Sequence, residues 1–119
     1  MEFRDNQAIY LQIADHIIEN ILLKKWPKGE RIPSVREMAV QLEVNPNTVA
    51  RTYNFLQEKE IIFNKRGIGY FVAENGLERA KAAKREEFIK YDVPAFFQKM
   101  ELLEMTLDEV YEKYKNKSN

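Results

Sequence analysis

One stretch of the chain carries side chains suited to binding a polyanion and none that would repel it. Residues 44–57 contain a single cation, Arg51, and no acid, although Asp and Glu together number 19 among the 119 residues. The neighbouring Asn47, Thr48 and Asn54 can donate hydrogen bonds to phosphates and base edges. This pattern favours a nucleic-acid-binding surface, and the alternative is a polar helix face that meets only solvent.

The residues on which most enzymes and metal sites depend are scarce. Cys is absent, which removes disulfides, thiolate zinc sites and cysteine nucleophiles together. The single histidine, His16, falls within a predicted helix and is interpreted as a structural residue. The chain has no glycine-rich phosphate loop and no pair of carboxylates outside amphipathic helix faces. We therefore predict that the protein is not an enzyme and uses no cofactor or metal.

Two helices joined by a tight turn, between residues 33 and 56, are predicted to position the polar surface. Ser34 and Glu37 have the spacing of a capping box, in which each side chain accepts from the backbone N–H of the other residue. Glu43 and Val44 form the turn that ends this first helix. The apolar stripe of the first helix consists of Val35, Met38, Ala39 and Leu42.

The second of these helices is predicted to cover residues 46–59. Asn45 is its N-cap, and Pro46 takes the first helical position, where a missing N–H costs nothing. The polar surface forms its outer face. Its inner face is expected to carry Val49, Thr52, Tyr53 and Leu56.

A basic hairpin is predicted directly after the two helices. Residues 61–63 and 70–72 are short β-prone runs, and residues 64–69 between them contain Lys65, Arg66 and Gly67. Gly67 is expected to supply a positive φ angle in the turn. The two cations are either solvated turn charges or contacts to DNA phosphates or the minor groove. Their position behind the helix pair favours DNA contacts, as in the wing of a winged helix.

Further helices are predicted on both sides of this module. Residues 7–25 place apolar side chains on two adjacent stripes, as in a core helix that is buried on more than one side. Asn75 and Gly76 mark a boundary. We therefore expect a winged helix-turn-helix domain over residues 1–75 and a helical dimerisation segment over residues 76–119. The predicted fold class is α+β, mainly α.

The C-terminal segment is expected to be interrupted near residues 91–93. Pro94 disfavours a continuous helix there, and Asp92 is a candidate N-cap for the helix that follows. Thr106 and Glu109 have the spacing of a second capping box, which predicts the start of a last short helix.

This segment is too small to hold a core of its own, yet it is rich in apolar side chains. Leaving them exposed would cost about 25 cal/mol per Å². They are expected to be covered either by the winged helix or by a second copy of the chain. We favour the second copy, because a two-fold symmetric protein matches a two-fold symmetric DNA site. The residues predicted to join the two copies are Phe88, Phe96, Phe97, Met100, Leu103 and Tyr111.

A small-molecule effector is a further possible partner. Aromatic residues of the same segment are candidates for its pocket, but we favour a place for them in the dimer core. These residues are Tyr91, Phe96, Phe97, Tyr111 and Tyr114.

Composition and charge narrow the class of protein further. The chain has 45% hydrophobic and 32% charged residues, and it has no run of about 18 apolar residues that would cross a membrane. Its first residues lack the apolar stretch of a secretory signal, so we expect a cytoplasmic protein without membrane contact. The formal net charge is zero, whereas DNA-binding domains are often basic. Any DNA-binding cations must therefore be well placed rather than numerous.

Residues 9–73 resemble the N-terminal domain of GntR-type bacterial transcription regulators. The motifs that carry this resemblance are GERIPSVREMA (29–39), VNPNTVARTY (44–53) and RGIGYFV (66–72). The short C-terminal part is similar to that of the YtrA-like subfamily. The resemblance implies a homodimeric repressor that binds double-stranded DNA at a palindromic operator, through helix 46–59 and the wing at 64–69. A winged helix that binds only proteins is the alternative.

The resemblance also implies which residues contact DNA. Relatives with larger C-terminal domains often carry a basic residue where this chain has Ala50, and glycine is common in the turn where this chain has Glu43. Base preference and turn geometry therefore cannot be transferred directly from those relatives. The predicted DNA-contact residues are Ser34, Arg36, Asn45, Pro46, Asn47, Thr48, Arg51, Tyr53, Lys65, Arg66 and Gly67.

Overall fold

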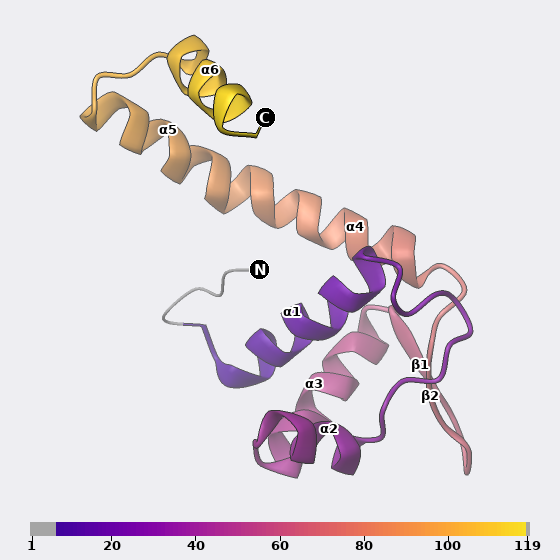
Figure 1. Cartoon of the computed structure of the whole chain (residues 1–119). Helices are drawn as coiled ribbons and strands as arrows, with labels where there is room; N and C mark the ends of the chain where they lie inside the picture. The colour runs from indigo at the N-terminus through magenta and orange to yellow at the C-terminus, as the bar shows by residue number, and fades with distance from the viewer. Residues whose placement is uncertain (1–6, 119) are drawn as a thin grey trace. The chain divides into compact units, whose positions relative to one another are not determined.

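The computed structural model describes residues 7–118 and divides the chain into two units, with the division after Ala82. The first unit contains three helices, a two-stranded antiparallel sheet and the start of a fourth helix (Figure 1). The fold is mainly helical with one small sheet, which confirms the predicted fold class. The elements of the first unit are α1 (Ile9–Leu22), α2 (Val35–Leu42), α3 (Pro46–Glu58), β1 (Ile62–Lys65), β2 (Gly69–Val72) and the beginning of α4 (Gly76–Glu87).

The core of the first unit lies around α3, which contacts α1, α2 and β1. Helix α1 buries side chains on adjacent stripes, as its sequence predicts, although it ends at Leu22 rather than near residue 25. Lys24 has a φ of 62°, so the backbone leaves the helix there. The fully buried side chains include Ile17, Ile21, Met38, Val49, Tyr53, Leu56, Ile62 and Val72.

The helix-turn-helix begins with the predicted capping box. The Ser34 hydroxyl accepts from the Glu37 N–H at 3.1 Å, and the Glu37 carboxylate accepts from the Ser34 N–H at 2.9 Å. Helix α2 ends at Glu43, which adopts a left-handed conformation with φ 55° and ψ 48°. Helix α3 begins with Asn45, whose side chain accepts from the Asn47 N–H at 2.7 Å. These contacts confirm the caps predicted for both helices.

The hairpin forms as predicted, with slightly different bounds. Its register pairs Ile62 with Val72 and Lys65 with Gly69, so the strands extend further into the expected turn. Gly67 has a φ of +78°, which confirms the predicted positive angle. The segment before α2 adds a third, shorter line of backbone pairing, because the Ile32 N–H donates to the Tyr70 carbonyl at 2.9 Å.

The start of α4 packs onto the core of the first unit. A Cβ atom at Gly76 would lie 2.6 Å from the Ile61 carbonyl oxygen, so only glycine permits this close approach. Ala80, in the next turn of α4, is fully buried. These contacts extend the first unit beyond the expected boundary at residues 75 and 76.

The second unit is helical. After α4 the chain continues as a π-helical turn (Phe88–Asp92), α5 (Val93–Leu102) and α6 (Leu107–Ser118). The prediction that Asp92 caps a new helix is wrong, because its backbone is helical (φ −74°, ψ −41°) and its side chain makes no capping bond. Pro94 lacks an N–H, and the π-helical turn before it accommodates the proline within the helical path. The predicted cap of α6 is confirmed, because the Thr106 hydroxyl accepts from the Glu109 N–H at 3.2 Å.

Tyr53→Phe is expected to lower the free energy of unfolding. The Tyr53 hydroxyl donates to the Pro33 carbonyl, and removing a buried donor costs roughly 1–3 kcal/mol. Urea denaturation followed by circular dichroism measures the change. Equal stability of Tyr53→Phe and the wild type would contradict the structural role of this hydrogen bond.

Tyr53 also predicts that the fold loses stability at alkaline pH. Burial, with smaller contributions from Tyr70 and Glu37, raises the pKa of the Tyr53 phenol. An unfolded tyrosine titrates near pH ~10, so the stabilisation by neutral Tyr53 is complete below that pH and is lost as the pH rises beyond it. Wild-type stability should therefore fall more steeply above pH ~10 than that of Tyr53→Phe.

Candidate nucleic-acid interface

The acid-free surface predicted from the sequence, residues 44–57, lies on the outer side of α3 and ends before the exposed Glu58. Asn47, Arg51 and Asn54 are exposed, and Thr48 is half-buried. Thr52, on the inner side, is buried and donates its hydroxyl to the Tyr10 carbonyl at 2.7 Å. The first turn of α3 also exposes Asn45 and Pro46. The described residues thus present the polar side chains of α3 together on one accessible face.

Arg51 is held by an aromatic residue of α1 that sequence analysis did not single out. Its guanidinium carbon lies 3.9 Å from the centroid of the Tyr10 ring. The Tyr10 ring in turn meets Phe55 edge-on, with centroids 6.0 Å apart. Stacking on an aromatic face stabilises a guanidinium by about 0.5–1 kcal/mol at exposed sites. Tyr10 falls within the helix predicted over residues 7–25, and nothing in local spacing indicates its contact with a residue on another helix.

Tyr53 does not belong among the DNA-contact residues, and this prediction is corrected. Its side chain is 0% exposed, and its ring meets Tyr70 edge-on with centroids 4.7 Å apart. Its position in α3 is opposite the polar face, so a phosphate or base cannot reach it. Tyr53 instead fixes the position of α3, because its hydroxyl bonds the segment just before α2.

The N-terminal end of α2 provides another cation. Arg36 is exposed, whereas Ser34 is half-buried and its hydroxyl already accepts the capping bond. Glu37, the acid that directly follows Arg36, takes part in the capping box. Hydrogen bonds from the Ser34 backbone and side chain lower the pKa of Glu37, with a further contribution from the positive charge of Arg31. Glu37 therefore remains a carboxylate that stabilises the helix end.

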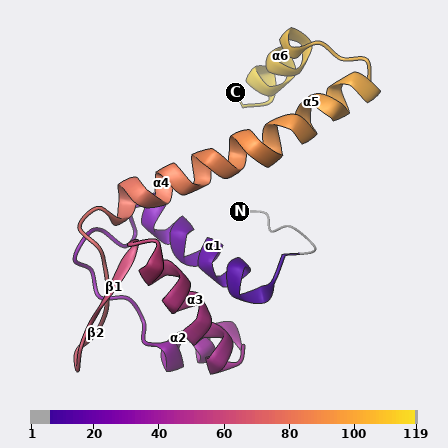
Figure 2. The same cartoon turned by 180° about the vertical axis from the view of Figure 1, so that it is seen from behind.

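The wing carries its cations at the turn between the strands. Lys65, Arg66 and Gly67 are exposed there. The Lys65 ammonium lies 5.3 Å from the centroid of the Phe71 ring. Figures 1 and 2 show the turn of the hairpin at the same end of the first unit as α2 and the first turn of α3. The unit thus brings the predicted cations of α2, α3 and the wing to one side.

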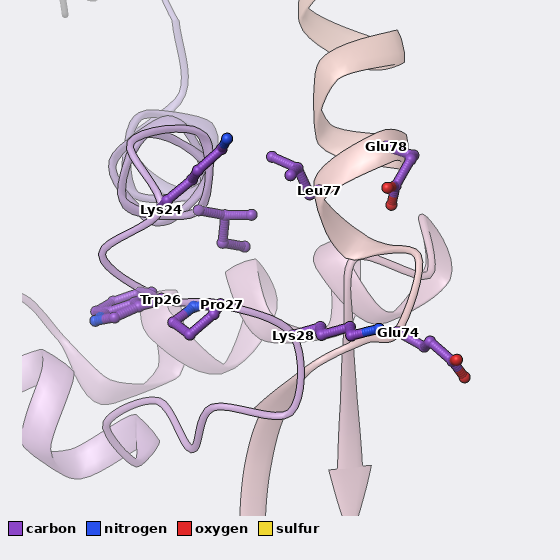
Figure 3. Close-up of a pocket in the computed structure, with 8 residues that line it drawn as sticks. Lys24, Trp26, Pro27, Lys28, Glu74, Leu77 and Glu78 are labelled. Carbon is purple, nitrogen blue, oxygen red and sulfur yellow. The ribbon is translucent and has the colours of Figure 1, made fainter.

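A small cavity of about 170 Å³ lies elsewhere in the first unit. Figure 3 shows it between the end of α1, the segment that follows and the start of α4. None of the aromatic residues of the second unit that were considered for an effector pocket line it. Its lining residues are Ile21, Lys24, Trp26, Pro27, Lys28, Glu74, Leu77 and Glu78.

Residues 7–118 form neither a metal site nor a membrane-spanning helix. No cluster of three or more His, Asp or Glu side chains in this part of the chain is arranged to hold a metal ion. Every helix described there is too short or too polar to cross a bilayer.

A helix-turn-helix followed by a basic hairpin defines the first unit as a winged helix-turn-helix, a class of domain that binds DNA. Residues 9–72 match the family of bacterial regulatory proteins described as the gntR family. The chain therefore belongs to the GntR family and is a DNA-binding transcriptional regulator, not an enzyme. This finding confirms the resemblance derived from the motifs.

Several relatives share most of the chain. The HTH-type transcriptional regulator YhcF of Bacillus subtilis is 37% identical over 113 residues, which cover 93% of this chain and 90% of YhcF. The transcriptional repressor YtrA of the same organism is 39% identical over 72 residues, covering 60% of this chain and 55% of YtrA. The crystal structure of a GntR-family regulator from Bacteroides thetaiotaomicron has 43% identity and a TM-score of 0.74, covering 94% of this chain and 100% of that chain.

Glu43→Gly is expected to stabilise the fold by about 0.5 kcal/mol, because a residue with a Cβ is strained in the left-handed conformation that Glu43 adopts. The midpoint of urea unfolding measures this gain. Gln41→Gly is the matched control, since Gln41 lies within α2 and glycine should destabilise a helix by roughly 1 kcal/mol. A loss of stability with Glu43→Gly would show that the turn tolerates its glutamate without strain.

Proposed function

We propose that this chain is a homodimeric transcriptional repressor that binds a palindromic operator through α3 and the wing. The observation that carries the proposal is the outer face of α3, which exposes Asn47 and Arg51 and contains no acid before Glu58, the last residue of the helix, in a chain of zero net charge. A duplex in contact with this face between residues 46 and 57 meets donors and a cation without a repelling carboxylate. The relative YtrA, a transcriptional repressor, supports the choice of repression.

In the proposed complex α3 enters the major groove. Asn47, Arg51 and Thr48 meet base edges, and an arginine that bonds guanine with two donors provides roughly 1–3 kcal/mol of discrimination. Arg36 and the wing residues Lys65 and Arg66 bind phosphates, which gives an affinity that falls as salt rises. The proposed contact surface also includes residues that lie beside these groups, namely Ser34, Asn45, Pro46 and Gly67. Such a repressor acts on the bacterial chromosome and therefore in the cytoplasm.

Dimerisation is proposed to occur through the second unit. Met100 is buried within the chain, whereas the other predicted pairing residues remain exposed. The most exposed of them, Leu103, has 67% of its surface accessible. Covering these side chains with a second copy would remove apolar surface from water at about 25 cal/mol per Å². The exposed pairing residues are Phe88, Phe96, Phe97, Leu103 and Tyr111.

The first test is selection of bound duplexes from a random pool, followed by binding of the selected sequence at several salt concentrations. The proposal expects an inverted repeat with half-sites about one helical turn apart, roughly 34 Å, or a multiple of it. Binding to no duplex at low salt would instead favour a winged helix that contacts only proteins.

Arg51→Ala is expected to reduce the preference for the selected operator over random DNA by about tenfold, which corresponds to ~1.4 kcal/mol of lost base discrimination. Fluorescence anisotropy with both duplexes measures the ratio, and sedimentation confirms that the dimer persists. Arg85→Ala removes an exposed arginine from α4 and should leave the ratio unchanged. An unaltered preference in Arg51→Ala would exclude this side chain from base recognition.

Leu103→Asp is expected to weaken the dimer at least about tenfold, because it would bury a charge at the apolar contact. Folding should persist, since Leu103 is exposed in the single chain. Sedimentation equilibrium across a concentration series measures the effect. Leu23→Asp introduces the same charge at a leucine with 58% exposure in the first unit and serves as the control. If both variants dimerise like the wild type, the proposed interface is in the wrong place.

A further inference from the structure

The segment just before α2 is part of the wing. The Val72 N–H donates to the Glu30 carbonyl at 2.9 Å, and Arg31 forms a β-bridge with Phe71. Residues that face each other across antiparallel pairs lie on the same side of a sheet. Arg31, Phe71 and Phe63, which is paired with Phe71, therefore share one side.

The arginine side chain extends along the wing over a glycine. A Cβ atom at Gly69 would lie 2.9 Å from the Arg31 Nε atom, so the guanidinium occupies the space that any other residue would fill. Gly69 pairs with Lys65 in the register of the hairpin. The guanidinium of Arg31 thus lies beside the strand position opposite Lys65, close to the basic turn.

An aromatic pair lies on this side of the sheet and contacts Lys65. Phe63 and Phe71 stack with centroids 5.6 Å apart and planes inclined by 23°. The Lys65 ammonium lies 5.3 Å from the centroid of Phe71. Neither ring carries a charge that would form an ion pair with Arg31 or Lys65.

Arg31 is available for an external anion. Its residue is exposed, and it forms no ion pair with a carboxylate among residues 7–118. The charge of Arg31 lowers the pKa of Glu37, but the Glu37 carboxylate already accepts a hydrogen bond from the Ser34 N–H. A guanidinium presents paired donors that match two oxygens of a phosphate.

We propose that Arg31, laid over Gly69 beside Lys65, is a third cation of the wing and binds a phosphate of the DNA backbone. This inference rests on the proposed function and extends its contact surface to the strand that precedes α2. The contact is independent of base sequence, because phosphates are the same in every duplex. Arg31 therefore contributes affinity and salt dependence, and leaves base preference to α3.

The test uses the full chain and measures binding to the selected operator and to a random duplex over a range of salt concentrations. Arg31→Gln, which keeps a polar side chain and removes the charge, should make the slope of log affinity against log salt shallower by about 1.8, because each of the two copies loses one phosphate contact. The affinity for both duplexes should fall by the same factor. Arg31→Lys retains the charge and should retain the slope.

Two further variants serve as controls in the same assay. Lys65→Ala, at the neighbouring wing cation, should reduce the slope by a similar amount. Lys28→Ala removes a cation of the same linker that lines the cavity in Figure 3, and it should leave the slope unchanged. Circular dichroism verifies that each variant is folded.

The outcomes separate this inference from the proposed function. A wild-type slope in Arg31→Gln, with normal salt-dependent binding by the wild type, overturns the role of Arg31 alone. A loss restricted to the operator also overturns it, because a phosphate contact does not distinguish sequences. Absence of DNA binding by the wild type overturns the proposed function and this inference together.

Discussion

Burial of the inner side of α3 is the constraint on which the rest of the structure depends. Val49, Tyr53 and Leu56 are fully buried, and Thr52 bonds the backbone of α1. Helix geometry fixes the directions in which successive side chains point, so burial of these residues determines which other residues of α3 face solvent. The Tyr53 hydroxyl also bonds the segment before α2, so the two helices of the motif and the linker are fixed by one buried residue. The polar face of α3 is thus defined by the core behind it.

Local patterns in the sequence predicted local structure well. The caps at Ser34 and Asn45, the positive φ of Gly67 and the helix-turn-helix itself depend on residues a few positions apart, and the structure confirms them. The motifs identified the family, which the comparisons confirm. The residues proposed to bind DNA and to join two copies remain predictions, because both roles concern partners outside the chain.

The errors arise where distant segments meet. The position of Tyr53 within a motif suggested contact with DNA, but its neighbours Pro33 and Tyr70 come from other parts of the chain and enclose it. The π-helical turn that accommodates Pro94 replaces the cap expected at Asp92, because a helix can absorb a missing N–H by changing its local winding. Tyr10 and Arg31 were missed for the same reason as Tyr53, since their contacts lie across helix and strand pairings.

Because the net charge of the chain is zero, its affinity for DNA cannot come from an overall excess of positive charge. The cations proposed to contact DNA are few (Arg31, Arg36, Arg51, Lys65 and Arg66), so a single copy has few phosphate contacts with which to bind. In the proposed dimer, binding of one copy brings the second to its half-site at high effective concentration, and the affinity rises without new contacts. The exposed apolar residues of the second unit then acquire a role in DNA binding although they do not touch DNA. On this argument the strength of the dimer and the strength of operator binding change together.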